Sequence, residues 1–179
     1  MKWKILSSDY LLKTPWLTVR KDHIRQSSGV ELDDFYIIES QDWVNVIAIT
    51  EEGNYIIEEQ YRHGIQQVCI ELCAGNVERD ETPLQAAQRE LLEETGYTGG
   101  EWSLIGIYSP NTSSMTNFCH CFLAKGVYKV QVQHLDKSEE IHTRIISEEE
   151  LRQLLVDDCF FEGVMAAPIW KYLSTKLTT

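Results

Sequence analysis

The amino-acid sequence predicts an α/β protein in which β-strands make up much of the chain. Short runs of β-branched and aromatic residues recur along it, and the first forty residues show little helix signal. Between Thr82 and Gly96 the hydrophobic period changes from two to about three and a half, which is typical of a helix. The 179 residues suit one domain with a small additional segment. We expect an N-terminal antiparallel β-rich segment over residues 1–40 and the main domain over residues 41–179.

Strand signals follow one another along both parts of the chain. In the N-terminal segment they lie at residues 3–6, 16–24 and 35–39, and a Ser-Ser-Gly turn at residues 27–29 precedes the last of them. In the main domain they lie at residues 43–50, 55–60, 68–72, 102–108, 118–124, 128–133 and 141–146. The turn-forming residues 51–54 predict a hairpin between the first two strands of the main domain.

One helix is marked at both ends. Thr82 is a good N-cap, Pro83 suits the first helical position, Gln85 completes a capping box and Gly96 can adopt the left-handed conformation that ends a helix. Two further helices are predicted over residues 147–156 and 162–173.

The charge balance limits the classes of partner. The chain has 16 Lys and Arg against 28 Asp and Glu, a net charge of −12, so it would repel the phosphate backbone of a nucleic acid. No stretch approaches the ~20 apolar residues of a membrane span, and charged residues interrupt the start of the chain before a signal-peptide core could form. We expect a cytoplasmic protein without nucleic-acid or membrane partners.

The five cysteines show no disulfide-framework spacing, which favours free thiols in a reducing compartment. Cys119, His120 and Cys121 together suggest a zinc site. In a strand, however, the two cysteines share one face while the histidine points to the other, so the three side chains cannot converge on one ion.

Three carboxylates gather on one side of the predicted helix. Glu90, Glu93 and Glu94 lie three and four positions apart, and like charges at that spacing cost about 0.2–0.5 kcal/mol per pair. Arg89 can reach Glu93, and a hard divalent cation such as Mg²⁺ or Mn²⁺ would offset the remaining repulsion. The alternative interpretation is a solvated acidic helix face.

The region around these carboxylates has a specific pattern. From Gly75 to Tyr97 the sequence reads G-x5-E-x7-R-E-U-x-E-E-x-G-U, where U is a bulky apolar residue. It resembles the box that defines Nudix hydrolases, with the aromatic Tyr97 where an aliphatic residue is usual. The resemblance implies an α/β/α sandwich with a mixed sheet, a box that forms a loop, a helix and a second loop, and hydrolysis of a nucleoside diphosphate linked to another moiety.

The resemblance also implies roles for the box residues. The implied ligands of a divalent metal, Mg²⁺ or Mn²⁺, are the carboxylates of Glu90, Glu93 and Glu94 and the carbonyl of Ala74. Arg89 would orient these glutamates through a salt bridge, and Glu81 would be mainly structural. Metal ions that bridge a pyrophosphate would neutralise charge on the leaving phosphate and activate a bound water.

Segments outside the box resemble the ADP-ribose and ADP-sugar pyrophosphatase branch of the family, at residues 59–64, 71–75, 108–110 and 120–124. By this resemblance Arg62 would bind the phosphates of the substrate; a surface salt bridge is its alternative role. Cys73 stands where the branch has a proline. Asn117 stands where the branch usually has an acidic residue near the substrate.

The general base and the base-stacking groups are further candidates. In this branch the general base comes from an acidic loop after the box, and residues 136–140 match that description. Glu140 is the first candidate for the general base and Glu139 the second. The alternative is an ordinary hydrophilic loop. Trp16 and Trp43 could stack on a nucleobase, although strand tryptophans are more often anchors of a core or an interface.

These observations predict a hydrolase of ADP-ribose or another ADP-sugar. The alternatives are hydrolysis of GDP-mannose, a dinucleotide or a nucleotide cofactor, and a non-catalytic Nudix-fold sensor. The aromatic residues of segment 1–40 predict a homodimer in which a second copy covers them; the alternative is that the segment folds back on its own core.

Overall fold

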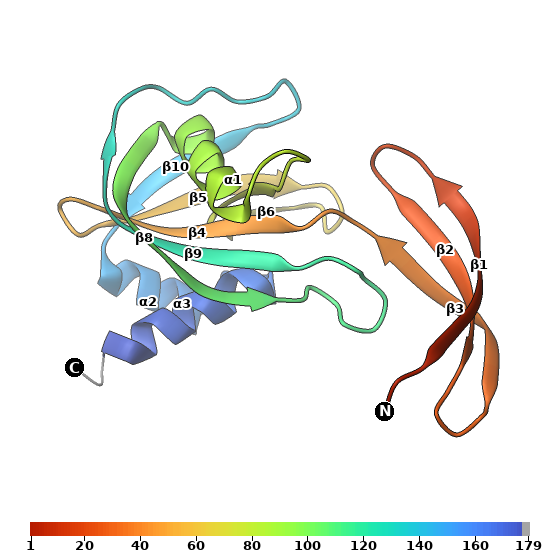
Figure 1. Cartoon of the computed structure of the whole chain (residues 1–179). Coiled ribbons are helices and arrows are strands. Elements are labelled where there is room, and N and C mark those ends of the chain that lie inside the picture. The colour runs from red at the N-terminus through yellow and green to blue at the C-terminus, as the bar shows by residue number, and fades with distance from the viewer. Residues whose placement is uncertain (177–179) are drawn as a thin grey trace. The chain divides into compact units, whose positions relative to one another are not determined.

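The protein, described here over residues 1–176 of a computed structural model, divides into two compact units. The first unit contains residues 1–41 and 109–118, and the second contains the rest of the described chain (Figure 1). Residues 109–118 were predicted to lie in the main domain, whereas by their contacts they belong with the N-terminal segment.

The first unit is a three-stranded antiparallel sheet in the order β1-β2-β3. Its strands are β1 (Lys4–Lys13), β2 (Thr18–Arg25) and β3 (Glu31–Glu39). The segment 109–118 attaches to β3 through two backbone hydrogen bonds: the Ile38 N–H donates to the Ser114 carbonyl at 2.7 Å, and the Thr116 N–H donates to the Ile38 carbonyl at 3.2 Å. The N-terminal β-rich segment thus has the antiparallel form that the sequence predicts.

The second unit is built on a seven-stranded mixed sheet. Its central order is β10-β5-β4-β9-β8, with β6 paired to β5 and β7 paired to β4; β4 and β9 run parallel, and the other pairs are antiparallel. The strands are β4 (Trp43–Thr50), β5 (Tyr55–Arg62), β6 (Gln67–Glu71), β7 (Cys73–Asn76), β8 (Tyr97–Tyr108), β9 (Cys119–Lys129) and β10 (Ile141–Ile146). Nearly every residue of β4 is buried, as its β-branched sequence predicts.

Helices cover both faces of this sheet (Figure 1). One face carries α1 (Pro83–Glu90), which continues into the π-helix η1 (Leu91–Thr95); the other carries α2 (Glu148–Val156) and α3 (Gly163–Lys176). Separate apolar clusters fill the two interfaces, one around Leu91 and the other around Ile169. The predicted α/β/α sandwich with a mixed sheet is therefore confirmed. Within residues 1–176, no helix is both long and apolar enough to cross a lipid bilayer.

Several strands are longer than predicted, β1 and β8 most of all, and two elements differ from the sequence prediction in kind. The strand expected at residues 128–133 was wrong: β9 ends at Lys129, and residues 130–140 form a loop. Backbone N–H groups of this loop bind the end of η1 instead, since those of Val130 and His134 donate to the carbonyls of Gly96 and Glu93 at 2.9 and 2.7 Å. Strand β7 was not predicted, because Cys-Ala-Gly-Asn has little intrinsic strand propensity and becomes extended by pairing with β4.

Candidate active site

The loop that leads into α1 begins the helix as its sequence predicts. Thr82 is the N-cap: its hydroxyl accepts a hydrogen bond from the Gln85 N–H at 3.3 Å, and the Gln85 side chain accepts one from the Thr82 N–H at 2.8 Å. Gly96 ends the helical segment with φ of 76°, the left-handed conformation that favours glycine. The capping box and the glycine stop are both confirmed.

The helix changes from α to π at Leu91, which the periodicity did not predict. The Thr95 hydroxyl donates to the Leu91 carbonyl at 2.5 Å inside this turn. The turn lies between Glu90 and the end of the box, and Glu94 within it is buried, with 5% of its surface exposed. The alternative interpretation, a solvated acidic helix face, is therefore wrong for Glu94. Short π-helical segments are frequent at functional sites.

The carboxylates of Glu90 and Glu94 lie against the backbone of Ala74 and Gly75 in β7. A Cβ atom added to Gly75 would lie 1.9 Å from Glu90 Oε1, so the absence of a side chain there admits the carboxylate. Glu94 Oε2 accepts a hydrogen bond from the Ala74 N–H at 3.1 Å. The structure thus brings two of the three predicted metal-binding carboxylates, Glu90 and Glu94, next to the predicted backbone ligand, Ala74.

Arg89 links the box glutamates to one another. Its guanidinium lies 2.7 Å from Glu81, 2.9 Å from Glu90 and 3.2 Å from Glu93, and it donates to the Asn76 carbonyl at 3.0 Å. The guanidinium lowers the pKa of Glu81, whose carboxylate also accepts from the Glu78 N–H. One arginine therefore holds the entry loop, β7 and the helix together, and the predicted contact between Arg89 and Glu93 is present.

Burial determines the protonation of the two inner carboxylates. It raises the pKa of Glu94 to about 8, with a further contribution from the nearby Glu90 charge, and burial likewise raises the pKa of Glu90. The side chain of Glu93 is 46% exposed. Two adjacent carboxylates, one buried and one partly buried, have raised pKa values, and a bound divalent cation would reverse this shift because its charge favours the ionised forms.

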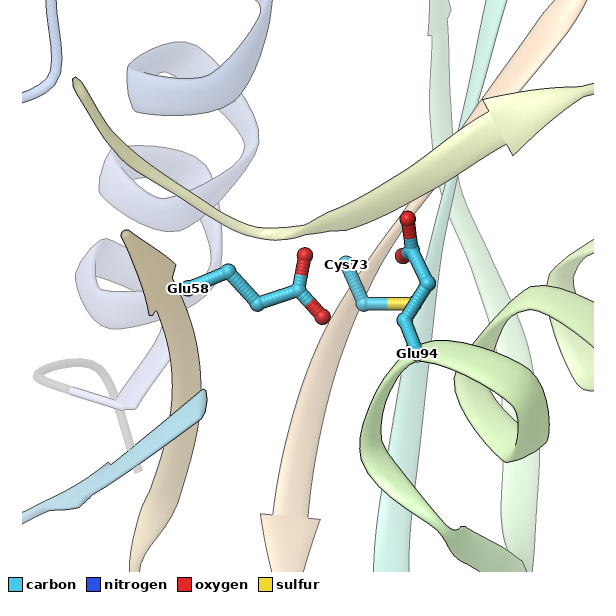
Figure 2. A group of neighbouring side chains, drawn as sticks. All are labelled: Glu58, Cys73 and Glu94. Atoms are coloured by element: carbon cyan, nitrogen blue, oxygen red, sulfur yellow. The ribbon is translucent and has the colours of Figure 1, made fainter. Parts of the chain in front are cut away.

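A further buried carboxylate, Glu58, was missed by the sequence analysis. Glu58 lies in β5 and is 3% exposed, and its Oε1 has no hydrogen-bond partner among residues 1–176. Burial raises its pKa well above the ordinary value, and the neighbouring carboxylates Glu94 and Glu71 raise it further. Figure 2 shows its carboxylate directed toward Cys73 and Glu94. The signal in the sequence was an acidic residue directly after the buried run 55–57.

Arg62 lies at the end of β5, where it is bound to another protein side chain. Its Nε donates to Glu71 Oε1 at 2.7 Å, and its terminal nitrogen forms a second contact with the same carboxylate. Its side chain is 45% exposed, while that of Glu71 is 5% exposed. The salt-bridge alternative is therefore present, and the exposed guanidinium leaves the phosphate-binding role as a prediction.

The acidic loop after β9 is attached to the same helix end. The Gln133 side chain donates to the Glu94 carbonyl at 2.5 Å and to the Thr143 hydroxyl at 2.7 Å. Glu139 accepts from the Asp136 N–H at 2.9 Å, and its charge contributes to the raised pKa values of Glu90 and Glu94. Glu140 is exposed. The charge of Glu139 therefore acts on the inner carboxylates, although the sequence analysis placed Glu140 first.

The remaining predicted substrate-binding residues lie in different surroundings. Trp43 is partly buried and packs against the core beneath α3. Trp16 and Asn117 belong to the first unit: Trp16 is 94% exposed, and Asn117 is 6% exposed with an Oδ1 that has no hydrogen-bond partner in the described part of the chain. The structure thus supports the core-anchor interpretation for Trp43 and leaves Trp16 available to a ligand or a partner.

Side chains alternate along β9 as predicted for the Cys-His-Cys sequence. The sulfurs of Cys119 and Cys121 lie 3.7 Å apart in the core, whereas His120 Nε2 lies 3.0 Å from Asp42 Oδ2. The histidine therefore does not converge with the two thiols.

Comparisons with known proteins agree with this arrangement. Residues 40–162 match the NUDIX domain model, and residues 3–38 match the model of the nucleoside diphosphate sugar hydrolase N-terminal domain. The chain is 30% identical over 134 residues to the ADP-ribose pyrophosphatase of Bacillus subtilis (strain 168), covering 74% of this chain and 72% of that protein. It is also 30% identical over 121 residues to the methanol dehydrogenase activator of Bacillus methanolicus, covering 67% of this chain and 65% of that protein.

A solved structure has the same fold. The crystal structure of ADP compounds hydrolase superposes with a TM-score of 0.85 at 19% identity and covers 97% of this chain and 94% of that chain. The match of the NUDIX model extends over more than half of the sequence and includes the whole carboxylate site. The chain therefore belongs to the Nudix family.

Proposed function

We propose that the protein is a divalent-metal-dependent pyrophosphohydrolase of nucleoside diphosphate sugars. ADP-ribose or another ADP-sugar is the first candidate substrate, and the products are a nucleoside monophosphate and a sugar phosphate. The observation that carries this proposal is the placement of the buried Glu94 and the partly buried Glu90 against Ala74 and Gly75. The similarity to an ADP-ribose pyrophosphatase supports the substrate class.

The donor set fits a hard divalent cation. Carboxylate and carbonyl oxygens are the ligands that Mg²⁺ and Mn²⁺ prefer, and Glu90, Glu93, Glu94 and the Ala74 carbonyl would supply them. Such an ion, when bound, supplies electrostatic stabilisation to a pyrophosphate and lowers the pKa of its bound water. Arg89 contributes by holding Glu90 and Glu93 in position, at 2.9 and 3.2 Å.

The remaining roles involve groups that contact the substrate. Arg62 would bind a phosphate through the exposed part of its guanidinium while Glu71 holds the other part. A glutamate of the loop 130–140, Glu139 or Glu140, would accept the proton of the attacking water. Trp16 and Asn117 would contact the nucleoside or the sugar, while Trp43 would anchor the core.

The N-terminal unit is proposed to form a homodimer interface, and the protein is proposed to work in the cytoplasm. The unit carries exposed apolar side chains on a sheet of three strands, which is close to the smallest stable size. They include Ile5, Tyr10, Leu11, Leu12 and Trp16. A second copy would cover them.

A substrate panel tests the proposed activity. The purified full-length protein should release AMP from ADP-ribose in the presence of Mg²⁺, stop in excess EDTA, and turn over nucleoside triphosphates poorly. Faster turnover of GDP-mannose, a dinucleotide or a nucleotide cofactor would reassign the substrate. Tight binding of ADP-ribose without any turnover would instead identify a sensor.

A further inference from the structure

The buried cluster of Glu58, Cys73 and Glu94 contains two side chains, Glu58 and Cys73, that have no role in the proposed hydrolysis. The three side chains come from β5, β7 and η1 and are 3%, 1% and 5% exposed. One possible ligand atom from each lies within 4.8 Å of those of the other two (Figure 2). Only Glu94 belongs to the carboxylate set that the Nudix box predicts, so Glu58 and Cys73 extend that set toward the interior of the sheet.

Among residues 1–176, this cluster has no counter-ion to balance its carboxylates when they ionise. Glu58 Oε1 has no hydrogen-bond partner within residues 1–176, although Glu58 is almost fully buried. The cationic side chain whose charge acts on it, Arg62, is already bound to Glu71. A buried carboxylate oxygen without a partner costs free energy, and a coordinated cation is one of the few groups that can satisfy it.

We infer that Glu58, Cys73 and Glu94 form an inner metal site that takes a borderline-soft divalent cation of the Zn²⁺ class. This site is distinct from the Mg²⁺ position because its donor set contains a sulfur atom. Thiolates favour Zn²⁺ and similar ions, whereas Mg²⁺ prefers oxygen donors and retains its water ligands. One thiolate and two carboxylates are all ligands that zinc uses in proteins, and a site with three protein ligands leaves its fourth position open.

Binding exchanges protons for the ion. The S–H bond of Cys73 breaks, as does the O–H bond of each carboxyl group of Glu58 and Glu94 that is protonated; these protons pass to the solvent, and the freed electron pairs form the bonds to the cation. No oxidant or reductant takes part. The two carboxylates and the thiolate then carry three negative charges against two positive ones, in place of buried acids without a cation.

The shared ligand couples this site to the catalytic one. Glu94 contributes to both donor sets, while its Oε2 accepts from the Ala74 N–H. An ion in the inner site therefore acts on the side chain that the Mg²⁺ position requires. The inference concerns metal binding alone and does not depend on which substrate is hydrolysed.

Cobalt absorption tests the site directly. The metal-stripped full-length protein, titrated with Co²⁺, should develop the near-ultraviolet sulfur-to-cobalt charge-transfer band that marks a thiolate ligand. The band should disappear in Cys73→Ser and persist in the matched control Cys119→Ser, whose thiol is equally buried but lies in β9. Added Zn²⁺ should remove the band at a stoichiometry of one, and excess Mg²⁺ should not.

A second variant tests the carboxylate ligand. Glu58→Gln should keep the circular dichroism spectrum of the folded protein and weaken Co²⁺ binding by about tenfold or more. An absence of the band in the wild type, its survival in Cys73→Ser, or its loss in Cys119→Ser would each overturn the inference. Hydrolysis with Mg²⁺ alone is measured separately, so a failure of the proposed function would be recognised independently of the cobalt result.

Discussion

At the scale of single residues, the site is defined by carboxylates that no cationic side chain among residues 1–176 neutralises completely. Arg89 forms ion pairs with Glu81, Glu90 and Glu93 but not with Glu94. The pKa of Glu94 therefore rises to about 8, mainly through burial. The site is best satisfied when a metal ion is bound, and the protein should be less stable without one.

The variant Glu58→Gln should stabilise the metal-free protein. Burial raises the pKa of Glu58 in the folded state, so ionisation favours the unfolded chain once the pH exceeds the ordinary glutamate value of about 4.3. Stability is thus lost as the pH rises, and the gain from the neutral glutamine should be greater at pH 8 than at pH 5. A gain of about 1 kcal/mol corresponds to a rise of about 2–4 °C in Tm.

Thermal unfolding in EDTA at both pH values measures this effect. The control Glu101→Gln changes an exposed glutamate of β8 and should leave the Tm nearly unchanged. An equal or lower Tm for Glu58→Gln at pH 8 would show that the buried carboxylate is not a source of instability.

The sequence identified the box carboxylates but not their burial. Glu90, Glu93 and Glu94 were predicted because their separations along one helix suffice to bring them together. Glu58 was missed because its approach to Cys73 and Glu94 depends on how three separate elements pack. Spacing along the chain carries no information on such a contact.

At the scale of elements, β7 and the helical segment form a close fit that depends on Gly75. The glycine leaves the space in which the Glu90 carboxylate lies. Strand β7 itself was not predictable from its composition, whereas β4 and β10 have the predicted bounds because their sequences are rich in β-branched residues. The π-helical turn escaped prediction because apolar periodicity does not distinguish it from an α-helical turn over five residues.

The variant Gly75→Ala should reduce activity while the protein remains folded. An added methyl group would lie 1.9 Å from Glu90 Oε1, so the carboxylate must move away from the metal position. Misplacement of a catalytic group by about 1 Å can lower the rate about 10²-fold. The control Gly163→Ala adds the same methyl group where no atom lies within 4 Å. Steady-state kinetics with Mg²⁺ compare the two, and equal rates would exclude a positioning role for Gly75.

The loop 130–140 should contain the general base. Its backbone and Gln133 bind the carbonyls of Glu93 and Glu94, which fixes the loop beside the carboxylates. The charge of Glu139 acts on Glu90 and Glu94, so Glu139→Gln should lower kcat by roughly 10²–10⁴-fold with little change in KM.

Glu140→Gln is the matched comparison, because Glu140 is the first candidate for the general base in the sequence. A larger loss at Glu140 would restore that order. Small and equal effects at the two positions would place the base outside this loop.

At the scale of the whole molecule, the first unit carries more apolar surface than its small sheet can bury. Its exposed side chains include Leu11 and Leu12 in β1. Large exposed apolar patches usually mark an interaction surface, and a second copy of the chain is the partner that we propose.

The double substitution Leu11→Glu and Leu12→Glu should convert the proposed dimer into monomers. Two charges on β1 would have to be buried at the interface, and unpaired buried charges are strongly unfavourable. Light scattering of the full-length protein at micromolar concentration measures the mass. Val132→Glu, an exposed position in the second unit, is the control and should leave the mass unchanged. A wild type that is already monomeric at this concentration would reject the dimer.

The assignment of residues 109–118 to the first unit has a consequence for dissection of the protein. The chain passes between the two units at residues 41–42, 108–109 and 118–119, so three peptide connections join them. Cleavage at the first connection would separate residues 1–41 from the rest of the chain covalently. The backbone hydrogen bonds of Ile38 with Ser114 and Thr116 would still hold them to the loop 109–118. A protease cut there should give two bands on a denaturing gel and a single species in solution. A gene shortened to begin at Ser40 would leave residues 109–118 without the sheet to which they bind.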